Sequence, residues 1–189
     1  EYGLSNKFII GGSADLAAST KQIISDNTFG SNNYDGNSIE FGIREHAMGG
    51  IVNGLALHSK LIPYGSTFLV FSDYMRPSMR LASLMKVNSL FIFTHDSIYL
   101  GEDGPTHQPV EHLMSLRLIP NLDVIRPANN KELIHSYRFA LEKRDNPKVI
   151  VLSRQNMKFF DHDVSYKDFQ KGAYEFMPGS DITLIATGS

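Results

Sequence analysis

The chain has 189 residues, of which 42% are hydrophobic and 20% are charged, as in an ordinary globular domain with one core. Its net charge of −2, with 18 scattered Lys and Arg residues, excludes a basic surface for nucleic acid or an anionic membrane and favours a small-molecule ligand. The lack of cysteine excludes disulfides and thiol chemistry. With no signal peptide and no apolar run of ~20 residues, we expect a cytoplasmic protein.

Apolar runs rich in aromatic and β-branched residues predict strands, and segments with helical periodicity separate most of them. This alternation predicts an α/β fold: a three-layer sandwich with a mostly parallel sheet and helices on both faces. The expected strands are Phe8–Ile10, Ile62–Tyr64, Leu90–Thr94, Asp123–Ile125, Val149–Leu152 and Ile182–Ala186, with a further strand at Ser38–Phe41.

Three longer segments predict helices. The first spans Arg44–His58, with an apolar stripe of Met48, Ile51, Val52 and Leu55 and with glycines at 49, 50 and 54. Each glycine weakens a helix by about 1 kcal/mol relative to alanine, which indicates close approach of another backbone, within the domain or across a subunit interface. The second helix spans Asp73 or Tyr74 to Met85, capped by Ser72 or Asp73, and the third spans Asn130–Lys143.

Glu45 follows a glycine-containing turn and begins the first helix. The helix dipole stabilises a carboxylate at this position by about 0.3–1 kcal/mol. One interpretation of Glu45 is therefore an ordinary surface residue that complements the helix end. Alternatively, apolar residues on both sides desolvate the carboxyl group, raise its pKa and suit it to share a proton with a ligand nitrogen. Farther along, Phe68, Phe71 and Tyr74 form an aromatic stripe, which is core unless it borders a pocket, where such rings stack on flat heterocycles.

The segment 94–109 holds a dense group of histidines and acids after a buried strand. One interpretation is a metal site built from His95, Asp96, Glu102, Asp103, His107 and Glu111. Pro109 opposes its simplest form, because proline disrupts a helical ligand pair at 107 and 111. The other interpretation is recognition of a polyhydroxylated, phosphorylated substrate by His95, Asp103 and His107.

Two more fragments favour the substrate interpretation. The segment 11–15 follows a strand and leads to Ser19, where backbone N–H groups or hydroxyls can meet an anion. Arg154 follows another strand, where a guanidinium can grip a phosphate through two hydrogen bonds. Polar groups would therefore gather at the carboxyl ends of several strands, where α/β sheets bind ligands.

Five motifs, in order, resemble the middle domain of transketolase. They are Gly11-Gly-Ser-Ala-Asp15, Phe41-Gly-Ile-Arg-Glu-His-Ala-Met-Gly49, Thr94-His-Asp-Ser97, Gly101-Glu-Asp-Gly-Pro-Thr-His-Gln-Pro109 and Leu152-Ser-Arg-Gln155. The resemblance implies the pyrimidine-binding domain of a thiamin-diphosphate enzyme that moves a two-carbon ketol unit from a ketose phosphate to an aldose phosphate, in the pentose phosphate pathway. It implies such a domain over residues 1–180, with 181–189 beginning a linker or a C-terminal domain.

The resemblance also implies roles for individual residues. Glu45 would hydrogen-bond the ring nitrogen opposite the amino group of the pyrimidine, and favour the imino tautomer that takes the thiazolium proton. Phe71 would stack on this ring, with Phe68 and Tyr74 as pocket walls. Substrate contacts would come from Ser19, His95 and Arg154 to the phosphate, from Asp103 to the hydroxyl next to the carbonyl, and from His107 beside the reacting carbons.

Two departures from the family pattern are visible. Tyr99 stands where the family usually has glycine, so the loop would take a different course there unless its backbone accepts a side chain. The Gly-Asp-Gly…Asn segment that holds the diphosphate through a divalent metal, magnesium or calcium, is absent, as is an upstream arginine that grips the substrate phosphate. We therefore expect a fragment that is inactive alone, binds no metal itself, and shares its cofactor site with a homodimer partner and with the missing N-terminal and C-terminal domains.

Three alternatives stay open at this point. Dihydroxyacetone synthase and deoxyxylulose-phosphate synthase belong to the same superfamily, and the second would carry an arginine-containing segment in place of His95-Asp96-Ser97. A metallohydrolase that uses the His95–Glu111 cluster belongs to another class of enzyme. A non-catalytic interaction domain that kept the fold is the third.

Overall fold

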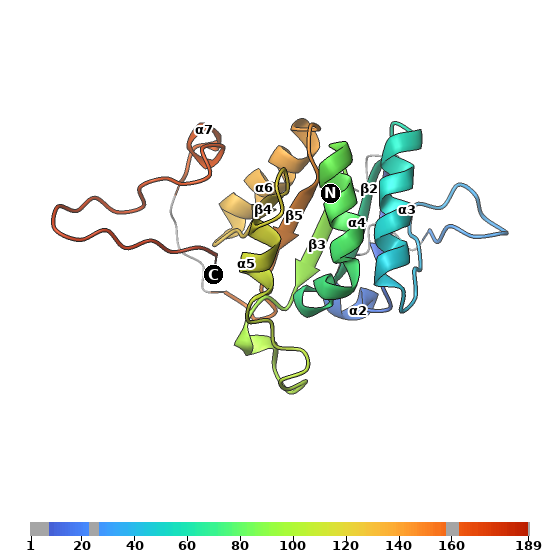
Figure 1. Cartoon of the computed structure of the whole chain (residues 1–189), viewed down its shortest axis with the longest axis horizontal. Coiled ribbons are helices and arrows are strands. Elements are labelled where there is room, and N and C mark those ends of the chain that lie inside the picture. Colours follow the sequence, from blue (N-terminus) through green and yellow to red (C-terminus); the bar gives the residue numbers. More distant parts are fainter. Residues whose placement is uncertain (1–7, 23–26, 158–162, 189) are drawn as a thin grey trace.

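The computed structural model describes residues 8–22, 27–157 and 163–188, and a parallel sheet lies at its centre (Figure 1). Its strands run in the order β1-β2-β3-β5-β4, all parallel, as predicted. The strands are β1 Ile9–Ser13, β2 Ile62–Phe68, β3 Leu90–Thr94, β4 Asp123–Ile125 and β5 Lys148–Val151. Five of the expected strands are therefore present, with β3 and β4 at their predicted bounds.

Helices cover both faces of the sheet, which confirms the three-layer α/β architecture. They are α2 Ala17–Thr20, α3 Glu45–His58, α4 Ser72–Met85, α5 His112–Arg117, α6 Asn130–Glu142 and α7 Tyr166–Phe169, with 3₁₀ turns η1 Leu69–Phe71 and η2 Ile98–Leu100. Residues of α3, α4 and α5 pack in one core cluster, whereas α6 contributes to the other. No helix in the described ranges is both long and apolar enough to cross a membrane.

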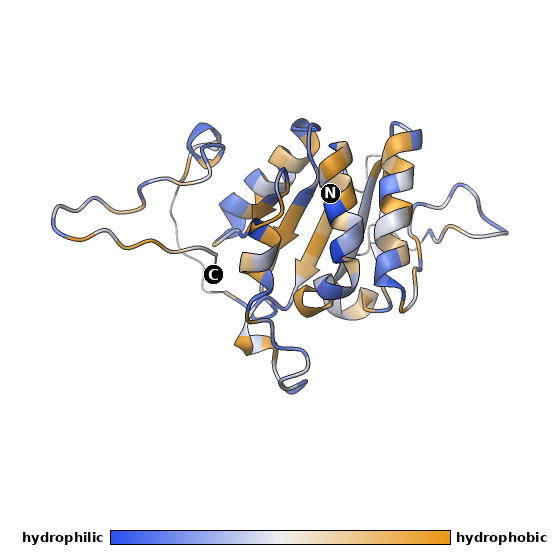
Figure 2. Ribbon diagram, viewed as in Figure 1, coloured by the Kyte–Doolittle hydropathy of each residue, from blue (hydrophilic) through white to orange (hydrophobic). Residues whose placement is uncertain are grey.

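The middle strand, β3, is buried along its whole length. Phe91 and Phe93 pack toward α3, α4 and α5, whereas Leu90 and Ile92 pack toward α6. This alternation follows from the two-residue period of a strand, and a strand covered on both faces needs apolar residues at both phases. Figure 2 accordingly shows the central strands as the most hydrophobic part of the fold.

Helices α3 and α4 lie side by side, and Gly49 permits their contact (Figure 1). A Cβ atom at position 49 would lie 2.7 Å from the Ser78 Cβ. The Asn53 side chain donates to the Ser78 carbonyl at 2.9 Å, one turn farther along α3. The expected close approach is therefore confirmed within the domain at Gly49. Gly50 and Gly54 have open space beside them in the described structure, so an interface role for them stays a prediction.

Three details of the predicted helices differ in the structure. Ile51 belongs to the predicted apolar stripe but is 47% exposed, whereas Met48 and Val52 are fully buried. Only one side of α3 faces the sheet, and with 3.6 residues per turn Met48 and Val52 point to that side, whereas Ile51 lies at its border. Helix α4 begins at Ser72 itself, directly after the 3₁₀ turn, with Phe71 in the cap position and no side-chain cap. The expected Ser72 or Asp73 cap was wrong, because the preceding 3₁₀ turn already supplies the first bend.

Two expected strands are not formed as predicted. Ser38–Phe41 contributes only isolated bridges, through which Ser38 pairs with Gly11 and Thr28. Ile182–Ala186 was predicted as a strand and this was wrong: it lies in the returning half of an arm that extends to one side of the sheet (Figure 1), with Leu184 and Ile185 exposed. Without a neighbouring strand its backbone has no ladder to join, so its β-forming residues alone do not make a strand.

We predict opposite effects from two alanine substitutions in α3. Gly49→Ala should destabilise the 189-residue chain by about 1–3 kcal/mol, because the new methyl group overlaps Ser78. Gly54→Ala, the matched control, should stabilise it by about 1 kcal/mol, because alanine favours the helix and nothing crowds position 54. Urea unfolding measures both. Equal effects of the two substitutions would contradict the close helix packing at Gly49.

Candidate active site

The carboxyl ends of the parallel strands bring the predicted site residues to one edge of the sheet. Phe71 follows β2, His95 follows β3 and Arg154 follows β5, and Asp15, which was not among the predicted site residues, follows β1. In parallel α/β sheets this edge is where ligands bind, because the strand ends and the helix N-termini meet there. The arrangement confirms that these sequence segments converge.

A tight turn places Glu45 at the start of α3. Gly42 has a positive φ of 65°, a conformation that glycine adopts without strain, and the turn 41–44 closes with Arg44 Nη1 donating to the Phe41 carbonyl at 3.0 Å. Arg44 occupies the N-cap position, so Glu45 is the first helical residue and its carboxylate adjoins the free N–H groups of the first turn. The Glu45 side chain is half-buried.

A cavity of about 500 Å³ joins several of these segments. Glu45 lines it from α3, Phe71 from η1, Tyr74 from the start of α4, and His107 from the loop after β3. The aromatic stripe therefore borders a pocket at Phe71 and Tyr74, as its second interpretation required. A carboxylate, an aromatic wall and an imidazole around one cavity of this size suit a flat nitrogen heterocycle.

Asp15 and Ile43 also line this cavity, and sequence reasoning did not assign them a site role. Asp15 also lines a second cavity, of about 560 Å³, beside β1 and α2. Its φ of 61° is uncommon for a residue other than glycine, and such outliers gather at functional sites. The sequence signal was the polar segment directly after β1, in which only Ser19 was selected.

His95 is buried directly after β3, in a left-handed conformation with φ 59°. Its ring stacks on Phe68, with centroids 3.7 Å apart, and its Nδ1 lies 2.9 Å from the Thr94 hydroxyl. Phe68 is itself buried and stacks on Phe71 at 6.0 Å, so it supports His95 from behind without lining the described cavities. The role of Phe68 as a cofactor contact stays a prediction.

The surroundings of His95 lower its pKa. Burial is the main cause, because it disfavours the charged imidazolium, and the positive charge of Arg154 acts in the same direction. The carboxylates of Asp103 and Asp96 oppose them, and a smaller lowering comes from His107. These contributions show that the three predicted substrate-binding residues Asp103, His107 and Arg154 lie close enough to His95 to influence its charge.

The loop after β3 holds these groups in place. The Arg154 guanidinium lies against Gly101, where a Cβ atom would be 3.4 Å from Cζ. The His107 and Phe71 rings are nearly perpendicular, with centroids 5.3 Å apart, and the His107 Nδ1 lies 2.8 Å from the Thr106 hydroxyl. Asp103 is exposed, and Ser19 is exposed on α2 and lines neither described cavity. The structure thus gathers most of the predicted site but leaves Ser19 at its margin.

Tyr99 does not disturb this loop. It has φ −79° and ψ 17°, which any residue adopts, and its side chain is 66% exposed. Its N–H donates to the Ser97 hydroxyl at 3.3 Å within the 3₁₀ turn. The backbone therefore accepts a side chain at the position where the resemblance implied glycine.

The loop acids and histidines do not assemble the metal site considered above. Among the described residues, one group of His, Asp and Glu has its ligand atoms close enough for a cation: Asp73, Glu111 and His112, within 4.8 Å of one another. Only Glu111 belongs to the six residues of the metal interpretation. His112 Nε2 and Asp73 Oδ2 lie 3.0 Å apart, so this pair links α5 to α4 directly.

Comparisons with known proteins agree with this geometry. The family described as "Transketolase, pyrimidine binding domain" matches residues 1–159. A transketolase from Halalkalibacterium halodurans is 49% identical over 187 residues, which cover 96% of this chain but 28% of that protein. The chain thus spans little more than a quarter of that relative.

Solved structures are similar as well. A transketolase from Leishmania mexicana superposes with a TM-score of 0.84 and 43% identity, over 88% of this chain and 25% of that chain. A Pichia stipitis transketolase in complex with sedoheptulose 7-phosphate gives a TM-score of 0.86 and 40% identity, over 91% of this chain and 26% of the other.

We predict that the His95 pKa responds in opposite directions to two neighbouring substitutions. Arg154→Gln should raise it, because a repelling charge is removed, and Asp103→Asn should lower it further. Histidine ring resonances followed by NMR against pH measure both shifts. Arg144→Gln removes an equal charge near Leu61, at the other edge of the sheet, and should leave the His95 pKa unchanged.

The lowered pKa of His95 also makes the folding stability depend on pH. Because folding lowers the His95 pKa, the unfolded chain binds this proton more readily than the folded chain does. The contribution of neutral His95 to stability is therefore lost as pH falls through the ordinary histidine range toward the folded pKa.

In the two substitutions above, shifts of the same sign in the Arg154 and Asp103 variants would contradict the placement of these groups around His95.

Proposed function

The chain belongs to the transketolase family, and on that premise we propose that it supplies the pyrimidine-binding part of a thiamin-diphosphate enzyme that transfers two-carbon ketol units. The donor would be a ketose phosphate and the acceptor an aldose phosphate. The observation that carries this proposal is the cavity shared by Glu45, Phe71, Tyr74 and His107. Its carboxylate and aromatic wall match the two needs of an aminopyrimidine: a partner for a ring nitrogen and a surface for stacking.

The residues of this cavity fit thiamin diphosphate by their chemistry. Phe71 and Tyr74 offer aromatic faces, and Glu45 offers a half-buried carboxyl group. When bound, the cofactor supplies the reactive carbon that carries the ketol unit. Glu45 would then share a proton between its carboxyl oxygen and the pyrimidine nitrogen.

The substrate would lie across the groups around His95. At neutral pH the buried imidazole is mainly neutral, because its pKa is lowered, and it offers a hydrogen bond to a phosphate oxygen. Arg154 adds a permanent positive charge, and Ser19 a hydroxyl at the margin. Asp103 accepts from a sugar hydroxyl, and His107, against the Phe71 ring, serves proton transfer at the reacting carbons.

The rest of the active site would come from other parts of the enzyme. The motif that holds the diphosphate through magnesium or calcium is absent from this sequence, and the chain spans 28% of a curated relative. We infer that the missing N-terminal domain of a homodimer partner contributes these contacts, and that the isolated chain is inactive. Residues 181–189 would begin a linker or the C-terminal domain. We further infer a cytoplasmic enzyme of the pentose phosphate pathway.

The alternatives have less support. The relatives and solved structures compared above are transketolases, which disfavours dihydroxyacetone synthase and deoxyxylulose-phosphate synthase. A metallohydrolase built on the cluster from His95 to Glu111 lacks support. Among the described residues, one group of His, Asp and Glu has ligand atoms close enough to hold a cation, and it includes only Glu111 of that cluster. A non-catalytic domain has no need for the cavity that joins Glu45 to His107.

We predict that Glu45→Gln lowers kcat for ketol transfer by about 100-fold or more in the full-length enzyme, because the proton shared with the cofactor is lost. A coupled assay with a ketose phosphate and an aldose phosphate measures the rate. Glu175→Gln, which changes an exposed carboxylate in the C-terminal arm, is the matched control and should keep full activity. A Glu45→Gln enzyme with normal kcat would overturn the role given to this residue.

A further inference from the structure

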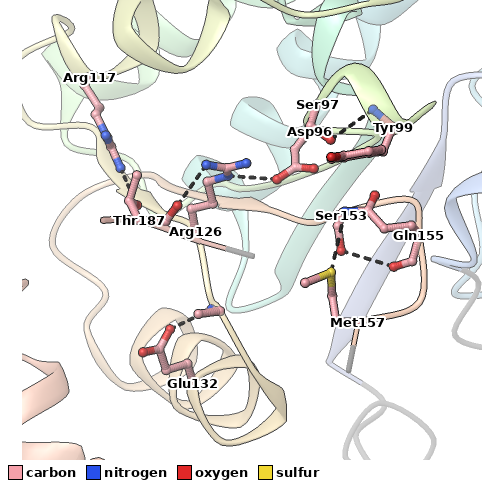
Figure 3. Close-up of polar contacts among 11 residues, drawn as sticks. Asp96, Ser97, Tyr99, Arg117, Arg126, Glu132, Ser153, Gln155, Met157 and Thr187 are labelled. Carbon is pink, nitrogen blue, oxygen red and sulfur yellow. Dashed lines mark hydrogen bonds and ion pairs between the residues drawn. The ribbon is translucent and has the colours of Figure 1, made fainter. Parts of the chain in front are cut away.

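Asp96 is buried beside His95, and it is paired with an arginine from a distant strand. Its side chain is 1% exposed, and its Oδ2 accepts a hydrogen bond from Arg126 Nε at 2.8 Å. Arg126 follows β4, whereas Asp96 follows β3, and β5 lies between these strands. The ion pair therefore crosses the sheet edge above β5 and ties two loops together (Figure 3).

The Asp96 carboxylate depends on this one partner. Its other oxygen, Oδ1, is buried and has no hydrogen-bond partner in the part of the chain that the structure describes. A buried carboxylate without compensation is unfavourable, so the Arg126 guanidinium compensates it and fixes the direction of this side chain. The arginine is itself oriented by a second contact, from its Nη1 to the Thr187 carbonyl at 2.9 Å, and Arg117 donates to the Thr187 hydroxyl (Figure 3).

His95, the residue before Asp96, needs an external restraint. Its φ of 59° is unfavourable for a side chain larger than glycine and persists only where the surroundings enforce it. The Phe68 stack and the Thr94 hydroxyl hold the ring, but neither holds the backbone on the carboxyl side of His95. The anchored side chain of Asp96 is attached to the next Cα atom, where it limits the motion of this backbone.

We propose that Asp96 is a positioning residue: through its ion pair with Arg126 it keeps His95 in the left-handed conformation that presents the imidazole to the phosphate of the substrate. This inference rests on the proposed function for the identity of the ligand. The Asp96 side chain is 1% exposed and points to Arg126, so it acts through His95 and not on the substrate directly.

The test compares Asp96→Asn with two other variants in the full-length enzyme. We expect Asp96→Asn to raise KM for a phosphorylated ketose donor about tenfold, the loss that one misplaced hydrogen bond to a charged group produces. The kcat value, and the KM for an unphosphorylated ketol donor, should stay close to wild type. Arg126→Lys keeps a positive partner and should restore part of the affinity, whereas Arg126→Met should resemble Asp96→Asn.

A matched control separates positioning from stability. Asp123→Asn breaks the ion pair between Asp123 and the buried Lys148, 3.0 Å apart, at the opposite end of β4 from Arg126. It should lower the melting temperature without changing either KM. In addition, Asp96→Asn should have no further effect on KM once His95→Ala is present, because coupled residues are not additive. An additive effect, or an equal rise in KM for both donors, would overturn the inference.

A crystal structure of the full-length Asp96→Asn enzyme tests the inference without any assay. We expect the His95 backbone to leave the left-handed region and its ring to lose the stack on Phe68. An unchanged His95 would refute the positioning role. If the wild-type enzyme transfers no ketol units, the proposed function fails, and this structural comparison still decides whether Asp96 positions His95.

Discussion

The burial of β3 on both faces is the constraint on which the rest of the structure depends. All five residues of this strand are buried, and it pairs with β2 on one side and β5 on the other. Polar side chains that could meet a ligand are therefore excluded along β3 and begin only where the strand ends, at Thr94 and His95. Because every neighbouring strand is parallel, the chain leaves the sheet at the same edge each time, and groups that are remote in sequence meet there.

Around His95 this geometry brings positive and negative side chains close together, and they act on its pKa in opposite directions. Arg154 arrives from β5, Asp103 from the following loop and Asp96 from the same strand end, whose partner Arg126 comes from β4. In a partly desolvated site each of these charges acts more strongly than it would in water. The charge state of one imidazole thus depends on groups that follow two strands, β3 and β5.

The sheet and its two helical layers could be predicted because their residues follow simple periods, as Leu90–Thr94 and Asp123–Ile125 show at their predicted bounds. The site was predictable only in part. Glu45 and His107 belong to recognisable motifs, whereas the cavity role of Asp15 depends on a left-handed backbone that no local pattern announces. The pairing of Asp96 with Arg126 depends on strand order, which periodicity does not encode. The segment Ile182–Ala186 failed because strand formation needs a neighbour, and not only suitable residues.

The unstrained, outward-facing Tyr99 gives experimental access to this loop. Its side chain is 66% exposed, and the natural sequence contains neither tryptophan nor cysteine. A tryptophan in place of Tyr99 would be the single indole of this chain, and a cysteine there would be its single thiol for a covalent dye. Either probe would sit on the loop that joins His95 to His107. Fluorescence from this one position would then follow the loop in real time as ligands arrive and leave.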